Sequence, residues 1–209
     1  MISQIHSPKI ATRVAGVVIA GGRSTRFGGE KAVAQFAGKP LLVWAADRLR
    51  TSCEQVAVNA RPGTEAEALA RAQGLAVLYD AAGDPAGPLS GVRAALQWAR
   101  DIGAAQLAVS PCDVPLLPED VFVRLLQEAH GGAALAETKD GLQPLCSVWP
   151  TTALDLLSAA LAGGKHPAIW RQLEALGAQR VRFDPASAFT NVNTREDLAS
   201  IAARVTQRT

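Results

Sequence analysis

Short apolar runs alternate with longer stretches of helical periodicity along most of the chain. Each run is rich in aliphatic residues and ends at glycine, proline or a polar residue, which is typical of a buried strand. Strands are expected at residues 17–20, 55–58, 75–79, 106–110, 133–137, 141–149 and 181–183. Helices are expected at residues 40–49, 66–72, 87–100, 118–128, 153–162, 167–176 and from about residue 194. Strands that alternate with helices predict an α/β fold with a mostly parallel sheet.

The first twelve residues differ in pattern from the rest of the chain. Residues 1–12 show no apolar periodicity and are expected to form a disordered leader, and residues 13–209 are expected to form a single domain. No apolar run approaches the roughly 20 residues needed to cross a bilayer, and the N-terminus lacks the apolar core of a signal peptide. The sequence therefore predicts a cytoplasmic protein with no membrane partner.

Composition narrows the function classes. Hydrophobic residues make up 48% of the chain and charged residues 19%, with a net charge of +2, so nucleic acid is not an expected partner. Cys53, Cys112 and Cys146 are too widely spaced for a disulfide framework or a Cys-x-x-Cys metal site, and no His-Glu-x-x-His motif is present. Any metal ion is expected to have oxygen ligands.

The first apolar run ends in a loop suited to an anion. Gly21 and Gly22 allow the backbone to approach a ligand closely, so that successive N–H groups can face its oxygens. Arg23, Arg26 and Lys31 add positive charge, which fits a nucleoside triphosphate. A glycine turn that only packs on a sheet explains the glycines but not the cations. The loop matches neither the Walker A motif nor Gly-x-Gly-x-x-Gly.

A second candidate site follows the apolar run at 106–110. Asp113 stands between Pro111 and Pro115, at the carboxyl end of this expected strand. Ligands of open α/β sheets lie at that edge, so Asp113 is expected to face the glycine loop. A carboxylate beside phosphates is suited to Mg²⁺, although a helix-capping role for Asp113 is the structural alternative.

These two sites carry a resemblance to a known family. Residues 19–31 match the signature L-A-G-G-x-S-x-R-M/F-G-x-x-K of nucleotidyltransferases with a Rossmann-like domain, with Ile19 at the Leu position and Phe27 at the Met position. The chain resembles in particular the molybdenum cofactor guanylyltransferases of the MobA type, over most of residues 14–199. Further matching segments, in order, are 38–40, 80–91, 111–118 and 189–198. The resemblance implies a Rossmann-like three-layer αβα sandwich.

The resemblance also implies roles for individual residues. The implied nucleotide-binding residues are Ile19, Ala20, Gly21, Gly22, Lys31, Asn59, Asp80, Pro88, Leu89, Gly91 and Asp113. The implied catalytic residues are Arg26, Lys31 and Asp113, with Asp113 as the Mg²⁺ ligand, and Asn191 and Asn193 are implied to position the substrate. Asp80 is expected to contact guanosine, whereas Pro88, Leu89 and Gly91 are expected to shape the wall around base and ribose. From the residues alone, Asn59 is also typical of a turn and Asp80 of a solvated loop charge.

The reaction implied by the resemblance is transfer of GMP from GTP to the phosphate of molybdenum-molybdopterin, with release of pyrophosphate. The implied partners are GTP, a molybdopterin-type cofactor and proteins that transiently deliver or receive it. A cytidylyl- or sugar-phosphate nucleotidyltransferase is the alternative, and the doubled glycine at residues 21–22 with the Asn-Val-Asn-Thr ending favours guanylyl transfer. A nucleotide-binding module without turnover is disfavoured, since binding alone needs neither Lys31 nor Asp113.

Overall fold

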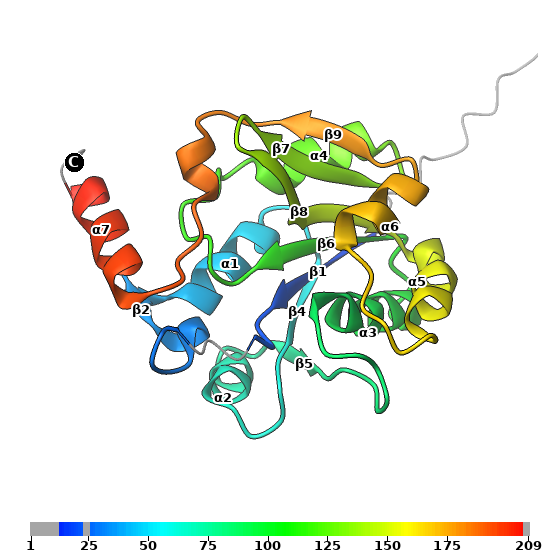
Figure 1. The fold of residues 1–209 in the computed structure, drawn as a ribbon, viewed down its shortest axis with the longest axis horizontal. Helices are drawn as coiled ribbons and strands as arrows, with labels where there is room; N and C mark the ends of the chain where they lie inside the picture. Colours follow the sequence, from blue (N-terminus) through cyan, green and yellow to red (C-terminus); the bar gives the residue numbers. More distant parts are fainter. Residues whose placement is uncertain (1–12, 23–25, 207–209) are drawn as a thin grey trace, which may run out of the picture.

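A seven-stranded sheet forms the centre of the computed structural model, which describes residues 13–22 and 26–206 (Figure 1). Its strands are β1 (Val14–Ile19), β4 (Gln55–Asn59), β5 (Ala76–Leu78), β6 (Gln106–Pro111), β7 (Ala134–Thr138), β8 (Gly141–Pro150) and β9 (Gln179–Arg182). Their spatial order is β5-β4-β1-β6-β8-β7-β9. Strand β8 pairs antiparallel with both of its neighbours, and the other pairs are parallel. The prediction of a mostly parallel sheet is confirmed.

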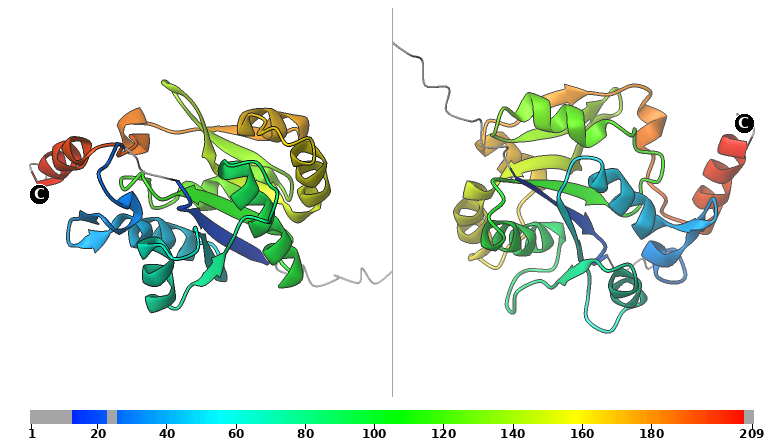
Figure 2. Two further views of the ribbon diagram at one scale, coloured as in Figure 1. Left: turned by 60° about the horizontal axis from the view of Figure 1, so that its bottom comes forward. Right: turned by 180° about the vertical axis from the view of Figure 1, so that it is seen from behind.

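Helices cover both faces of this sheet. They are α1 (Leu41–Arg50), α2 (Glu65–Ala72), α3 (Pro88–Asp101), α4 (Val121–Ala129), α5 (Leu154–Leu161), α6 (Ile169–Ala175) and α7 (Arg195–Thr206). Helices α1, α2 and α4 share one apolar cluster with the sheet, and α3, α5 and α6 share a second cluster on the opposite face (Figures 1 and 2). The three-layer αβα sandwich is therefore confirmed. None of the helices in the described part of the chain is long and apolar enough to cross a membrane.

Strand β1 is apolar throughout because both of its faces are buried. Val18 packs into the cluster on the α1 side and Val17 into the cluster on the α3 side, as the alternation of side chains along a strand requires. Gly16 lies against the end of α1, where a Cβ would come within 3.0 Å of the sulfur of Cys53 and 3.1 Å of Cβ of Leu49. Glycine at this position allows the helix to approach the strand closely.

The segment before α1 differs from its prediction. A small hairpin forms from β2 (Gln35–Phe36) and β3 (Lys39–Pro40), so the helix begins at Leu41 and not at Pro40. Ala37 and Gly38 turn the chain with φ angles of 47° and 77°, which is the conformation that a two-residue hairpin loop needs. Two-residue strands are too short to produce a periodic pattern in the sequence.

The ends of four parallel strands lie in one row. Ile19 at the end of β1 is paired with Asn59 on one side and with Pro111 on the other, and Asn59 is paired with Leu78. The loops that follow β1, β4, β5 and β6 therefore leave the sheet at the same edge, where ligands of open α/β sheets bind.

Helix α7 lies outside the two helical layers, beside the β2-β3 hairpin (Figures 1 and 2). Ile201 of this helix shares a third apolar cluster with Phe27, Phe36, Leu41 and Val192. This packing brings the C-terminal segment of the chain back to the loop that follows β1. The predicted leader, residues 1–12, and three loop residues, Arg23, Ser24 and Thr25, lie outside the described residues.

Candidate active site

A cleft of about 570 Å³ lies at the carboxyl edge of the sheet. It is lined by Ile19, Ala20, Gly21, Gly22, Arg26, Glu30, Lys31, Ala32, Asn59, Arg61, Thr64, Asp80, Ala86, Gly87, Pro88, Pro111, Cys112, Asp113, Leu145 and Asn193. The glycine loop after β1 and Asp113 after β6 therefore share one cleft, as the sequence predicted. Its volume lies within the usual range of about 300–1,000 Å³ for small-molecule sites.

Lys31 and Asp113 form an ion pair inside this cleft. Nζ of Lys31 lies 2.7 Å from Oδ2 of Asp113, and the two side chains are only 14% and 20% exposed. Lys31 opens the 3₁₀ helix Lys31–Val33, whereas Asp113 follows β6, so the fold brings together groups from distant parts of the chain. The pair holds one full positive and one full negative charge at the same partly buried place, where charges interact more strongly than in water.

The candidate metal ligand in the cleft is the single carboxylate of Asp113. Within residues 13–22 and 26–206, no group of three or more His, Cys, Asp and Glu side chains is arranged to hold a metal ion. Mg²⁺ usually takes one or two carboxylates and completes its shell with substrate phosphates and water. Asp113 alone satisfies that requirement from the protein side, so it remains the candidate ligand.

Asn59 and Asp80 form a second polar pair in the cleft. Nδ2 of Asn59 donates to Oδ1 of Asp80 at 2.9 Å, and Asn59 is 3% exposed. Asn59 is thus the buried last residue of β4 and not a solvated turn residue. Its side chain holds the Asp80 carboxylate at the cleft, so Asp80 is not a free loop charge.

Two of the predicted wall residues lie beneath the wall. Leu89 is fully buried in the apolar cluster under α3, and neither Leu89 nor Gly91 lines the cleft, whereas Pro88 does. A Cβ at residue 91 would lie 2.3 Å from Oδ1 of Asn59. Gly91 is therefore needed because α3 passes directly over the side chain of Asn59.

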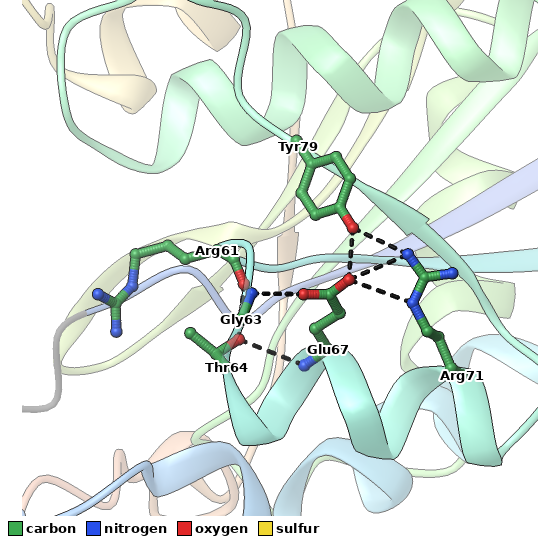
Figure 3. A network of polar contacts seen from close by, with 6 residues as sticks. All are labelled: Arg61, Gly63, Thr64, Glu67, Arg71 and Tyr79. Atoms are coloured by element: carbon green, nitrogen blue, oxygen red, sulfur yellow. Dashed lines mark hydrogen bonds and ion pairs between the residues drawn. The ribbon is translucent and has the colours of Figure 1, made fainter.

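The loop between β4 and α2 contributes residues that the motifs did not indicate. Arg61 and Thr64 line the cleft, and a polar network ties this loop to α2 (Figure 3). The network consists of Arg61, Gly63, Thr64, Glu67, Arg71 and Tyr79. The Glu67 carboxylate accepts from the Tyr79 hydroxyl at 2.5 Å and from the Gly63 N–H at 2.6 Å. These hydrogen bonds, with the two from Arg71, hold the pKa of Glu67 below its ordinary value.

Arg61 joins this network only through its backbone. Its carbonyl accepts from the Thr64 hydroxyl at 2.7 Å, and its guanidinium extends away from Glu67 (Figure 3). The network therefore fixes the backbone of the loop and leaves the Arg61 charge outside the ring of contacts around Glu67.

Glu30 connects the glycine loop to the same helix. Its carboxylate accepts from the backbone N–H of Ala66 at 2.8 Å, in the first turn of α2. A negative charge is favourable at a helix N-terminus, where N–H groups lack intrahelical partners. This contact anchors the residue directly before Lys31. The sequence signature treats residue 30 as variable, so it does not predict the contact between Glu30 and α2.

The C-terminal segment reaches the cleft beside Asp113. The backbone N–H of Val192 donates to the carbonyl of Asp113 at 2.8 Å. Asn193 lines the cleft, whereas Asn191 is exposed and is not among the lining residues. Of the two asparagines expected to position substrate, the structure thus brings only Asn193 to the site.

A reciprocal cap starts helix α7 next to Asn193. The Asp197 carboxylate accepts from the N–H groups of Asn193 and Thr194, each at 2.9 Å, and the Thr194 hydroxyl accepts from the Asp197 N–H at 3.1 Å. This arrangement has the form of a capping box. Thr194 is therefore the residue that caps the last helix.

The cap gives a pH-dependent prediction. The backbone N–H groups of Asn193 and Thr194 hold the pKa of Asp197 below its ordinary value of 3.8. A depressed carboxyl pKa contributes stability above the unfolded value, and that stability is lost as the pH falls through the folded value. Asp197→Ala is therefore expected to lower the melting temperature at pH 7, with the difference from the wild type shrinking as the pH falls below about 4. Thermal unfolding from pH 7 to pH 3 measures this, with Glu196→Ala in the same turn as the control. A difference that stays constant with pH would refute the role of the Asp197 charge.

Arg26 and Cys112 also line the cleft. Arg26 is exposed and lines the cleft, and its charge also helps to lower the pKa of Asp197. Burial raises the pKa of the Cys112 thiol to about 12, so thiolate is scarce at neutral pH. The Cys112 thiol is therefore poorly suited to act as a nucleophile.

Comparison with known proteins identifies the family. Residues 16–181 match the model of the MobA-like NTP transferase domain. The chain belongs to this family. A molybdenum cofactor guanylyltransferase of Cereibacter sphaeroides is 38% identical over 188 residues, which cover 90% of this chain and 94% of the relative. Another from Polynucleobacter asymbioticus is 34% identical over 198 residues, covering 91% of this chain and 96% of the relative.

A solved structure supports the same assignment. The molybdopterin-guanine dinucleotide biosynthesis protein A of Archaeoglobus fulgidus is 25% identical, with a TM-score of 0.73, and the match covers 93% of this chain and 100% of that one. The resemblance to the MobA-type family is thereby confirmed. The roles of individual residues still depend on the geometry of the cleft.

Proposed function

We propose that this MobA-like chain transfers GMP from GTP to the phosphate of molybdenum-molybdopterin and forms the guanine dinucleotide cofactor. A phosphate oxygen of the acceptor forms a bond to the α-phosphorus of GTP. The bond from that phosphorus to the bridging oxygen breaks, and pyrophosphate leaves with the electron pair. The observation that carries the proposal is the Lys31–Asp113 pair, which lies in the same cleft as Gly21 and Gly22 in a chain whose relatives are named guanylyltransferases.

The residues of the cleft fit the charges of this reaction. Gly21 and Gly22 offer backbone N–H groups to the phosphates, and Arg26 and Lys31 offset the negative charge that grows on pyrophosphate. Asp113 holds Mg²⁺, which, when bound, polarises and neutralises phosphate oxygens as a Lewis acid. The acceptor already carries an anionic phosphate, so positioning and charge neutralisation account for catalysis.

The guanosine of GTP and the acceptor are assigned to different sides of the cleft. The Asp80 carboxylate, held by Asn59, contacts the guanosine, and Pro88 forms part of the wall beside it. Asn193 lies next to Asp113 and positions the acceptor. The proposed setting is the cytoplasm, with proteins that deliver or receive the pterin cofactor as transient partners.

A thermal-shift series with GTP, CTP, ATP and UTP, each with and without Mg²⁺, tests the choice of base. GTP with Mg²⁺ is expected to raise the melting temperature by several degrees, because a ligand at about 100 times its Kd stabilises by about 2.7 kcal/mol. The other nucleotides are expected to give smaller shifts. Stabilisation by CTP but not by GTP would identify a cytidylyltransferase, and no shift with any nucleotide would refute the proposed site.

A further inference from the structure

His166 makes a contact far from its own position in the chain. It lies between α5 and α6, yet its Nε2 accepts from the backbone N–H of Leu89 at 2.9 Å. Its ring also covers Gly87, where a Cβ would lie 2.2 Å from Cδ2 of His166. The imidazole therefore occupies the space that any side chain at residue 87 would need.

This contact supplies a cap that α3 lacks locally. The first N–H groups of a helix have no intrahelical partners, and Gly87 at the N-cap has no side chain to accept from them. His166 provides the acceptor from another part of the fold. Nε2 accepts this hydrogen bond through its lone pair, so Nδ1 is the nitrogen left to donate.

The capped turn is part of the cleft wall. Ala86, Gly87 and Pro88 line the cleft, and the φ angle of Gly87 is 153°. The Ser90 hydroxyl, in the first turn of α3, donates to the Pro85 carbonyl at 2.7 Å, so this bond joins the turn to its own helix. The His166 contact instead ties the turn to the segment before α6.

We propose that His166 is a positioning residue for the nucleotide, which acts by fixing the Gly87–Pro88 turn that forms one wall of the cleft. A pre-formed wall lowers the ordering that binding requires, so its loss weakens nucleotide binding more than it slows the chemical step. This inference rests on the proposed function only in that a nucleotide occupies the cleft.

Three substitutions at His166 separate the hydrogen bond from simple packing. His166→Ala removes ring and acceptor, His166→Leu keeps apolar bulk without an acceptor, and His166→Gln restores an acceptor through its amide oxygen. His166→Ala and His166→Leu are expected to raise the KM for GTP and its calorimetric Kd with Mg²⁺ by about 5- to 10-fold, with kcat changed less than about 2-fold. His166→Gln is expected to return both to within about 3-fold of the wild type. His130→Asn, at the exposed end of α4, is the control and is expected to change neither.

Gly87→Ala provides an independent measurement. Its methyl group overlaps the imidazole, so the single variant is expected to raise Kd, and part of that increase is expected to vanish in the His166→Ala background. The proposal is overturned if His166→Leu binds like the wild type, if His166→Gln binds like His166→Ala, or if the two sites act additively. Calorimetry with whichever nucleotide stabilises the wild type keeps this test separate from the choice of GTP. Failure of the wild-type protein to transfer GMP from GTP would refute the proposed function instead.

Discussion

Asp113→Asn is expected to lower kcat/KM for Mg²⁺-dependent pyrophosphate release about 10³-fold. Asparagine keeps the size of the side chain but removes the negative charge, so the cleft loses its candidate metal ligand and the partner of Lys31 at 2.7 Å. The backbone contact from Val192 to the Asp113 carbonyl does not depend on the side chain and is expected to persist. Release of pyrophosphate from GTP, with the acceptor present and Mg²⁺ varied, measures the effect.

The chain offers a matched control for this substitution. Oδ2 of Asp47 lies 2.6 Å from Nζ of Lys39, in an ion pair of the same type outside the cleft. Asp47→Asn is expected to leave pyrophosphate release unchanged. Its effect on the melting temperature is expected to be small, like that of Asp113→Asn. Wild-type turnover by a folded Asp113→Asn variant would eliminate Asp113 as the metal ligand.

The shared cleft was predictable because its main signals are local. The glycine pair follows an apolar run directly, and Asp113 follows another, so each motif marks the end of a buried strand. Parallel strands place their carboxyl ends on one edge, and the register aligns Ile19 with Pro111. Two local patterns and one topological rule were enough to bring Gly22 and Asp113 together.

The sequence did not predict which motif residues line the cleft and which lie beneath its wall. A matched motif gives positions along the chain but not which side of a helix a residue occupies. Gly91 lies beneath the wall because the side chain of Asn59 fills the space where its Cβ would be. Leu89 faces the apolar cluster under α3, and Asn191 lies outside the cleft although Asn193 lines it.

Contacts between distant segments were also invisible in the sequence. Glu30 at the first turn of α2 and His166 at the first turn of α3 each satisfy a backbone N–H of a remote helix. Such contacts depend on how loops meet after the sheet has formed, and single acids or histidines carry no pattern that marks them. Both contacts hold segments that line the cleft, and neither Glu30 nor His166 stands at a position that a matched motif specifies.

Lys31→Ala is expected to lower kcat/KM about 10²- to 10³-fold. The Lys31 side chain is 14% exposed, and a charge in such a partly buried place stabilises a developing anion more strongly than a solvated one. Its charge is needed most as pyrophosphate leaves, so the loss is expected mainly in kcat and not in KM. Steady-state pyrophosphate release at saturating and limiting GTP measures both constants.

Two further lysine variants make the result specific. Lys31→Arg is expected to remain impaired, because a planar guanidinium differs in shape from the compact ammonium that lies 2.7 Å from the Asp113 carboxylate. Lys39→Ala removes the cation of the matched pair outside the cleft and is expected to retain activity. An unchanged kcat/KM in Lys31→Ala would mean that Lys31 does not act on the leaving group. Full activity in Lys31→Arg would mean that any cation at this position is sufficient.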